Sequence, residues 1–153
     1  MTDHELMQLS ESVGQALKQR GATLTTAESC TGGWVAKVIT DIAGSSAWFE
    51  RGFVTYSNEA KAQMIGVREP TLIEHGAVSE PVVIEMAIGA LRAARADYAI
   101  SISGIAGRTA AAMKSLSERS GLALRQRKGR GLPGGNASAA TVKACVVRPP
   151  FMR

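Results

Sequence analysis

The chain has 153 residues, of which 45% are hydrophobic and 20% charged, and its formal net charge is +5. This length suits a single domain with a core, and the lack of a run of about 18 apolar residues or of a basic-then-apolar leader argues against a membrane span and a secretory signal. Cys30 and Cys145 have no partners at metal-ligand spacing, so we expect a reducing, cytoplasmic location without a metal or other cofactor.

The charge is divided unevenly along the chain. Residues 1–107 hold 8 Lys and Arg against 12 Asp and Glu, a net charge of −4. Residues 108–153 hold 10 Lys and Arg and one acid, Glu118, a net charge of +9. We therefore interpret the chain as a mildly acidic α/β domain over 1–107, followed by a basic and poorly patterned tail over 108–153.

Hydrophobic spacing predicts alternating helices and strands in the first half of this domain. The expected elements are a helix over 4–20, a strand over 22–26, a polar turn over 27–33 and a helix over 34–42, which Gly44-Ser45-Ser46 ends.

The second half of the domain continues the alternation. We expect a strand over 53–57, a helix over 58–65 with Asn58 as its N-cap, a helix from Ser79-Glu80-Pro81 to Arg95, a strand over 98–103 and a loop over 104–107. Such alternation predicts a layered α/β domain with a largely parallel sheet, in which ligands bind at the carboxyl ends of strands. The loops at 27–33, 44–46 and 103–107 are then expected to meet in one crevice.

The tail lacks this pattern. Residues 108–131 contain helix-favouring side chains, whereas Gly, Pro and Ser in 132–153 predict loop or disorder. A basic, Gly-rich tail can bind nucleic acid through phosphates, but its one aromatic residue, Phe151, offers little for base stacking. A nucleic-acid-binding arm is therefore the weakest of the functions considered.

The turn over 27–33, between the first predicted strand and the next helix, is rich in small and hydroxyl residues. Such a turn exposes backbone N–H groups at a helix N-terminus, where a phosphate or carboxylate can bind. The alternative, which composition favours equally, is that this turn only caps the helix and binds no ligand. A Gly-x-x-Gly loop, Gly104 to Gly107, follows the last predicted strand and can bring backbone close to a ligand.

Serine and lysine residues suggest nucleophilic chemistry. Ser46 becomes a nucleophile if a base removes its proton, and Lys61 can do so when burial lowers the pKa of its amine, with Tyr56 as a proton relay. The alternative is a serine-rich turn and a solvated lysine. The Tyr56–Lys61 spacing misses Tyr-x-x-x-Lys and no GxGxxG is present, which disfavours a nicotinamide oxidoreductase.

In order and spacing, several segments together resemble the CinA C-terminal domain family over roughly residues 5–107: LTTAESCTGG (24–33), GSSAW (44–48), TYSNEAKA (55–62), HGAVSE (75–80) and SISGIAG (101–107). The resemblance implies a three-layer α/β/α sandwich and a homo-oligomer. It also implies hydrolysis of nicotinamide mononucleotide to nicotinic acid mononucleotide and ammonia, a step of pyridine-nucleotide salvage. A non-catalytic nucleotide-binding module is the alternative.

The resemblance also implies roles for individual residues. Ser46 is expected to attack the carboxamide with Lys61 as base and Tyr56 beside them, and Ser29 is the alternative nucleophile. The residues expected to bind substrate are Ser29, Thr31, Gly32, Gly33, Ser103, Gly104 and Gly107.

The resemblance to the family stops after Gly107, where a PDGG segment, further strands and a final helix are expected. Codons can be chosen that encode residues 107–122 as given and that encode GPDGGSNEEPVGTVWF once one base is inserted after the first codon. In the same shifted frame, codons for residues 128–138 can encode EGEGITRRECF, which also resembles the family. We interpret the tail as out of frame through a one-base deletion after the Gly107 codon. The C-terminal strands and helix are then expected to be missing, which puts the stability and the activity of this chain in doubt.

Overall fold

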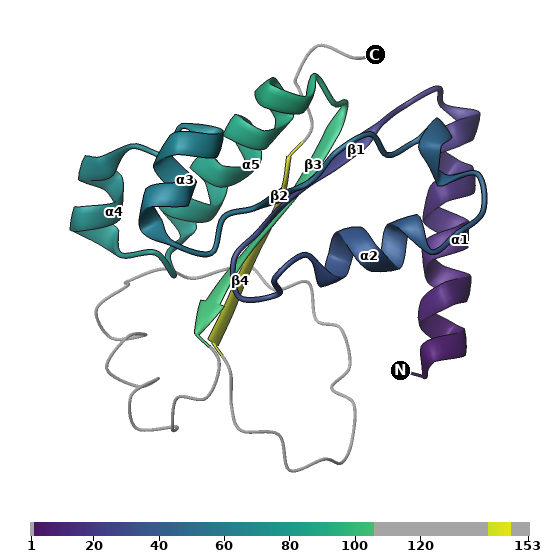
Figure 1. Ribbon diagram of the computed structural model, residues 1–153, viewed down its shortest axis with the longest axis horizontal. Helices are drawn as coiled ribbons and strands as arrows, with labels where there is room; N and C mark the ends of the chain where they lie inside the picture. The colour runs from purple at the N-terminus through teal and green to yellow at the C-terminus, as the bar shows by residue number, and fades with distance from the viewer. Residues whose placement is uncertain (1, 106–140, 148–153) are drawn as a thin grey trace.

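A computed structural model describes residues 2–105 and 141–147, which form an α/β fold around one sheet (Figure 1). The strands are β1 (Leu24–Glu28), β2 (Phe53–Val54), β3 (Tyr98–Ile105) and β4 (Thr141–Val147), in the order β2-β1-β3-β4. β1 pairs in parallel with β2 and β3, whereas β4 runs antiparallel to β3. The predicted parallel sheet is therefore confirmed for its first three strands.

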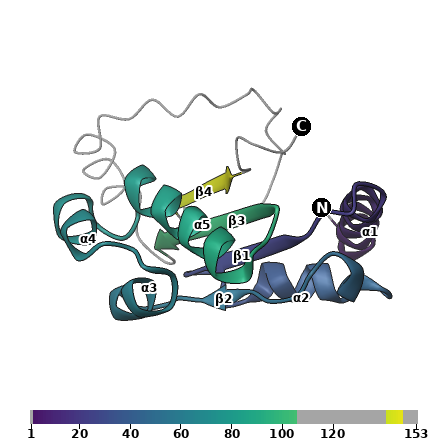
Figure 2. The same ribbon diagram turned by 90° about the horizontal axis from the view of Figure 1, so that it is seen from above.

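Helices cover both faces of the sheet (Figure 2). One face carries α1 (Asp3–Gln19) and α2 (Trp34–Thr40), and the other carries α3 (Asn58–Ile65), α4 (Glu69–His75) and α5 (Glu80–Ala94). The expected three layers are therefore present. None of the described helices is long and apolar enough to cross a bilayer.

Two hydrophobic cores lie on opposite sides of the sheet. The first packs α1 and α2 against β1 and is built around Trp48, which is 1% exposed. The second packs α3, α4 and α5 against β1 and includes Ile65, Val82 and Met86. Together these cores hold β1 in the middle of the molecule, so its carboxyl end is a fixed point of the fold.

Hydroxyl residues begin three of the helices. Thr2 and Glu5 form a reciprocal capping box at α1, and Ser79 caps α5 as predicted. At α3 the cap is Ser57, whose hydroxyl accepts from the Ala60 N–H at 3.0 Å, and not Asn58. The prediction of Asn58 was wrong because Ser57 has the extended backbone of an N-cap residue, and Asn58 is already the first helical residue.

The strand boundaries differ from those expected. β1 starts two residues later than predicted and continues through Glu28, β2 is only two residues long, and β3 extends beyond Ser103 to Ile105. α4 was not predicted, because its seven residues give too little apolar periodicity.

The last described strand corrects the prediction for the tail. Loop or disorder was expected over 132–153, yet Thr141–Val147 forms β4. The physical reason is that this segment is rich in Thr and Val, which favour strands, and that β3 without it would leave a row of unpaired backbone groups. Gly107 and the helix-favouring part of the tail lie outside the described residues.

Candidate active site

Ser29 stands directly after β1, at the carboxyl end of the central strand. Its backbone N–H donates to the carbonyl of Ile102 in β3 at 3.0 Å. On the other side, the N–H of Thr55 donates to the carbonyl of Glu28 at 2.7 Å. The Ser29 backbone is thus fixed between two neighbouring chain segments, in the position where parallel sheets place their ligands.

Lys61 lies on the first turns of α3 and reaches this point from the side. Its side chain is 1% exposed, and its Nζ donates to Ser29 Oγ at 3.0 Å, to the carbonyl of Thr55 at 2.8 Å and to the carbonyl of Tyr56 at 3.5 Å. Three acceptors therefore surround one buried amine. The Ser29–Lys61 pair has the geometry of a nucleophile and its base.

Burial also changes the acidity of this amine. Desolvation lowers the pKa of Lys61 below 10.5, and the electrostatic interaction with Cys30 partly opposes that shift. A larger fraction of Lys61 is therefore neutral at a given pH than for a solvated lysine. A neutral amine is the form that can take a proton from a serine hydroxyl.

A cavity of about 450 Å³ opens over the Ser29–Lys61 pair. Its lining comes from the carboxyl ends of β1 and β3, from α3 and from the segment that joins α4 to α5. The lining residues are Ser29, Cys30, Tyr56, Asn58, Lys61, His75, Gly76, Ala77, Val78, Ser103, Gly104 and Ile105. None of them is acidic, and the described residues contain no group of three side chains suited to hold a metal ion.

Several expected site residues meet in this cavity. Tyr56 lines it with a side chain that is 73% exposed, and Ser103 and Gly104 line it from β3. The Ser103 hydroxyl donates to the carbonyl of Ala77 at 2.7 Å, which ties β3 to the segment before α5. Gly107, the other expected substrate-binding residue of that loop, lies outside the described residues.

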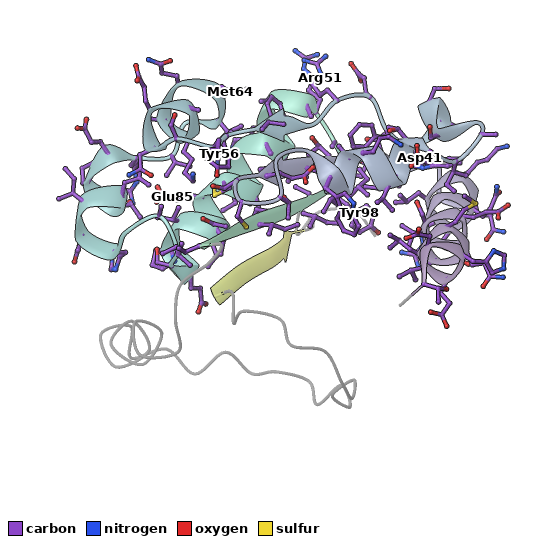
Figure 3. The ribbon with its side chains drawn as sticks, turned by 60° about the horizontal axis from the view of Figure 1, so that its bottom comes forward. Asp41, Arg51, Tyr56, Met64, Glu85 and Tyr98 are labelled. Carbon is purple, nitrogen blue, oxygen red and sulfur yellow. The ribbon has the colours of Figure 1, made fainter. Side chains whose placement is uncertain are left out.

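Ser46 lies elsewhere in the molecule. It belongs to the short 3₁₀ helix Ser45–Ala47 and is exposed, and the carbonyl of the nearby Trp48 accepts from the N–H of Leu24 at the amino end of β1. Ser46 is thus at the opposite edge of the sheet from Ser29, about 15 Å of strand away. Figure 3 shows Asp41, which follows α2, toward the end of the molecule where α1 lies, and Tyr56, which precedes α3, away from that end. The structure does not bring Ser46 to Lys61, and the three predicted loops do not form one crevice.

The Glu28 side chain stabilises the turn after β1 through hydrogen bonds. Its side chain is 1% exposed and accepts from the Thr31 hydroxyl and the Val35 N–H at 2.8 Å and from the Ala36 N–H at 2.9 Å. The backbone N–H groups at the start of α2 therefore bind the protein's own Glu28 carboxylate. Thr31, Gly32 and Gly33, which were expected to bind substrate, are not among the residues that line this cavity.

Sequence reasoning missed three polar residues of the cavity, which are Cys30, Asn58 and His75. Cys30 was considered only as a metal ligand and Asn58 only as a helix cap, and His75 was not singled out. All three belong to segments that carry the family resemblance, and that membership is the signal that could have found them. His75 was hard to place because it ends α4, the helix that was not predicted.

Comparison with known proteins identifies similar chains. The sequence profile described as "CinA C-terminal domain" matches residues 6–127. The nicotinamide-nucleotide amidohydrolase PncC of Escherichia coli (strain K12) is 91% identical over 107 residues, which are 70% of this chain and 65% of that protein. The protein of the same name from Enterobacter agglomerans is 64% identical over the same length. This chain thus spans slightly less than two thirds of the length of these relatives.

Solved structures share the fold. The competence/damage inducible protein CihA from Agrobacterium tumefaciens matches with a TM-score of 0.67 and 46% identity, over 70% of this chain and 64% of that one. A CinA superfamily protein from Klebsiella pneumoniae matches with a TM-score of 0.66 and 36% identity, over 97% of this chain and 83% of that one.

Proposed function

Because this chain belongs to the CinA C-terminal domain family, we propose that it is an amidohydrolase that converts nicotinamide mononucleotide to nicotinic acid mononucleotide and ammonia. The observation that carries the proposal is the 3.0 Å contact between the buried Lys61 amine and Ser29 Oγ in the wall of an open cavity. The identity of 91% to a nicotinamide-nucleotide amidohydrolase supports the choice of substrate.

Ser29 is the proposed nucleophile, in preference to Ser46. A serine hydroxyl reacts at neutral pH only if a base is within hydrogen-bond reach. Ser29 meets this condition with Lys61, whereas Ser46 lies near the amino end of β1.

The surroundings of Lys61 prepare it to act as a base. When the amine is neutral, its two N–H bonds can donate to the carbonyls of Thr55 and Tyr56, and its lone pair is left for the Ser29 hydroxyl. The two carbonyls thus orient the lone pair, and the lowered pKa of Lys61 makes the neutral form more accessible.

The reaction then runs in two halves. Ser29 Oγ attacks the carboxamide carbon while its proton passes to Lys61 Nζ, and Lys61 gives that proton to the departing nitrogen, which leaves as ammonia. An ester between Ser29 and the nicotinoyl group remains. Water attacks this ester and gives a proton to Lys61, which returns it to Ser29 Oγ as the acid product leaves. No metal or redox step is required.

Substitution of the two residues tests this proposal. In an ammonia-release assay with nicotinamide mononucleotide, we expect Ser29→Ala and Lys61→Met to lower kcat by about 10³-fold or more, as removal of a catalytic nucleophile or base does in other hydrolases. Ser46→Ala is the matched control and is expected to change kcat by less than about twofold.

Two results would contradict the proposal. Loss of activity in Ser46→Ala with retained activity in Ser29→Ala would reverse the assignment of the nucleophile. Binding of the mononucleotide without any ammonia release would favour the non-catalytic binding module instead.

A further inference from the structure

We propose that His75 recognises the phosphate group of the substrate, so that the cavity selects mononucleotides over nucleosides. This inference rests on the proposed function, because it concerns the same cavity. It starts from the ionisable side chains that line the cavity, where Lys61 and His75 are basic and none of the described lining residues is acidic. Such a lining suits an anionic ligand.

Lys61 is not available to hold a phosphate. Its ammonium has three N–H bonds, and three acceptors lie around it on Ser29, Thr55 and Tyr56. It is also buried at the reactive end of the cavity, where a phosphate dianion would lose its hydration. Among the described residues, this leaves His75 as the lining side chain that can carry a positive charge toward a ligand.

The position of His75 suits that task. It is the last residue of α4, and its imidazole lines the cavity with 41% of its side chain exposed. An imidazole N–H can donate a hydrogen bond to a phosphate oxygen, and the Glu74 carboxylate, 3.7 Å from His75 Nε2, is itself 75% exposed. An exposed imidazole can meet a phosphate without removing it fully from water.

The two ends of the cavity therefore match the two ends of the substrate. Ser29 and Lys61 are 7% and 1% exposed, which suits an uncharged carboxamide. His75, which is 41% exposed, suits a charged phosphate. The mononucleotide is expected to bind with its amide inward and its phosphate toward α4.

Binding measurements test His75 without requiring turnover. In a Ser29→Ala background, which prevents hydrolysis, calorimetry gives Kd for nicotinamide mononucleotide and for nicotinamide riboside. We expect His75→Gln to weaken mononucleotide binding about tenfold, the effect of one lost charge-assisted hydrogen bond, and to change riboside binding less than about twofold. His75→Lys, which keeps a positive charge, is expected to retain the preference for the mononucleotide.

His4→Gln is the matched control, because His4 is an exposed histidine on α1, away from the cavity lining. Equal weakening of both ligands by His75→Gln, or no weakening of the mononucleotide, would overturn the proposal, as would failure of the mononucleotide to bind. The proposed catalysis is judged separately, by ammonia release from the chain with Ser29 intact. A chain that prefers the mononucleotide through His75 but releases no ammonia would refute the catalysis and retain the phosphate site.

Discussion

Lys61 combines burial with a cationic side chain, and at the scale of single residues this has a consequence for pH dependence. Its amine must be neutral to accept the Ser29 proton, and burial lowers its pKa below 10.5. We therefore expect kcat/KM for the mononucleotide to rise with pH through an inflection below 10.5.

A pH–rate profile of the active chain measures that inflection. Lys61→Arg is the informative control, because a guanidinium stays protonated throughout this range and is expected to abolish the rise along with the activity. An inflection at or above 10.5, or a rise that persists in Lys61→Arg, would show that another group is the base.

The choice between Ser29 and Ser46 shows what the sequence could and could not decide about the site. Both serines lie in segments of small residues, so local composition does not separate them. Connectivity does, because Ser29 follows β1 and Ser103 lies near the carboxyl end of β3, whereas 44–46 follows α2 and precedes β2. In a parallel sheet these two kinds of loop lie at opposite edges. That rule was available from the predicted elements, but the 3.0 Å contact required the structure.

At the scale of elements, the close approach of α5 to α3 holds Lys61 in place. A Cβ added at Gly89 of α5 would lie 1.8 Å from the carbonyl oxygen of Ile65, the last residue of α3. A backbone carbonyl cannot move aside without shifting α3, which carries Lys61. Only glycine allows this contact.

We expect Gly89→Ala to lower the free energy of unfolding by about 1–3 kcal/mol through overpacking. Helix propensity alone predicts the opposite, a gain of about 1 kcal/mol. The exposed Ala93→Gly on the same helix is the matched control and is expected to cost about 1 kcal/mol through propensity. Denaturant unfolding of both variants measures this, and a stabilised Gly89→Ala would show that α3 and α5 can separate at no cost.

The elements that sequence analysis predicted well are long or clearly capped. α1 and α5 have several turns of apolar periodicity, and Ser79 with Pro81 marks the start of α5. β2 and α4 are too short for periodicity, so β2 was predicted too long and α4 was missed. β4 was missed because its pairing with β3 depends on a distant part of the chain, which local patterns do not show.

At the scale of the whole molecule, the chain matches its curated relatives over part of its length. The identity of 91% extends over 107 residues, which is 65% of the Escherichia coli protein. The one-base deletion after the Gly107 codon stays a prediction, as do the homo-oligomer and the cytoplasmic location. If the deletion is real, restoring the base should return the family's last elements to the chain.

We expect the frame-restored chain to unfold at a higher temperature than this chain and to release ammonia faster, because several elements would again cover the apolar faces of the sheet. DNA sequencing across the Gly107 codon, followed by thermal unfolding and the ammonia assay on both chains, checks this. An uninterrupted frame with unrelated codons, or a restored chain that is neither more stable nor more active, would contradict it.

The fixed backbone of Ser29 has one more consequence. Its amide hydrogen points into the middle of the sheet, toward Ile102, and the preceding carbonyl is bound by Thr55. Exchange of that hydrogen with solvent therefore requires the central strands to separate, which is an opening of the whole fold rather than a local fluctuation. We therefore expect the amide hydrogen of Ser29, the proposed nucleophile, to exchange slowly, and partial unfolding at the helices should leave its backbone in place.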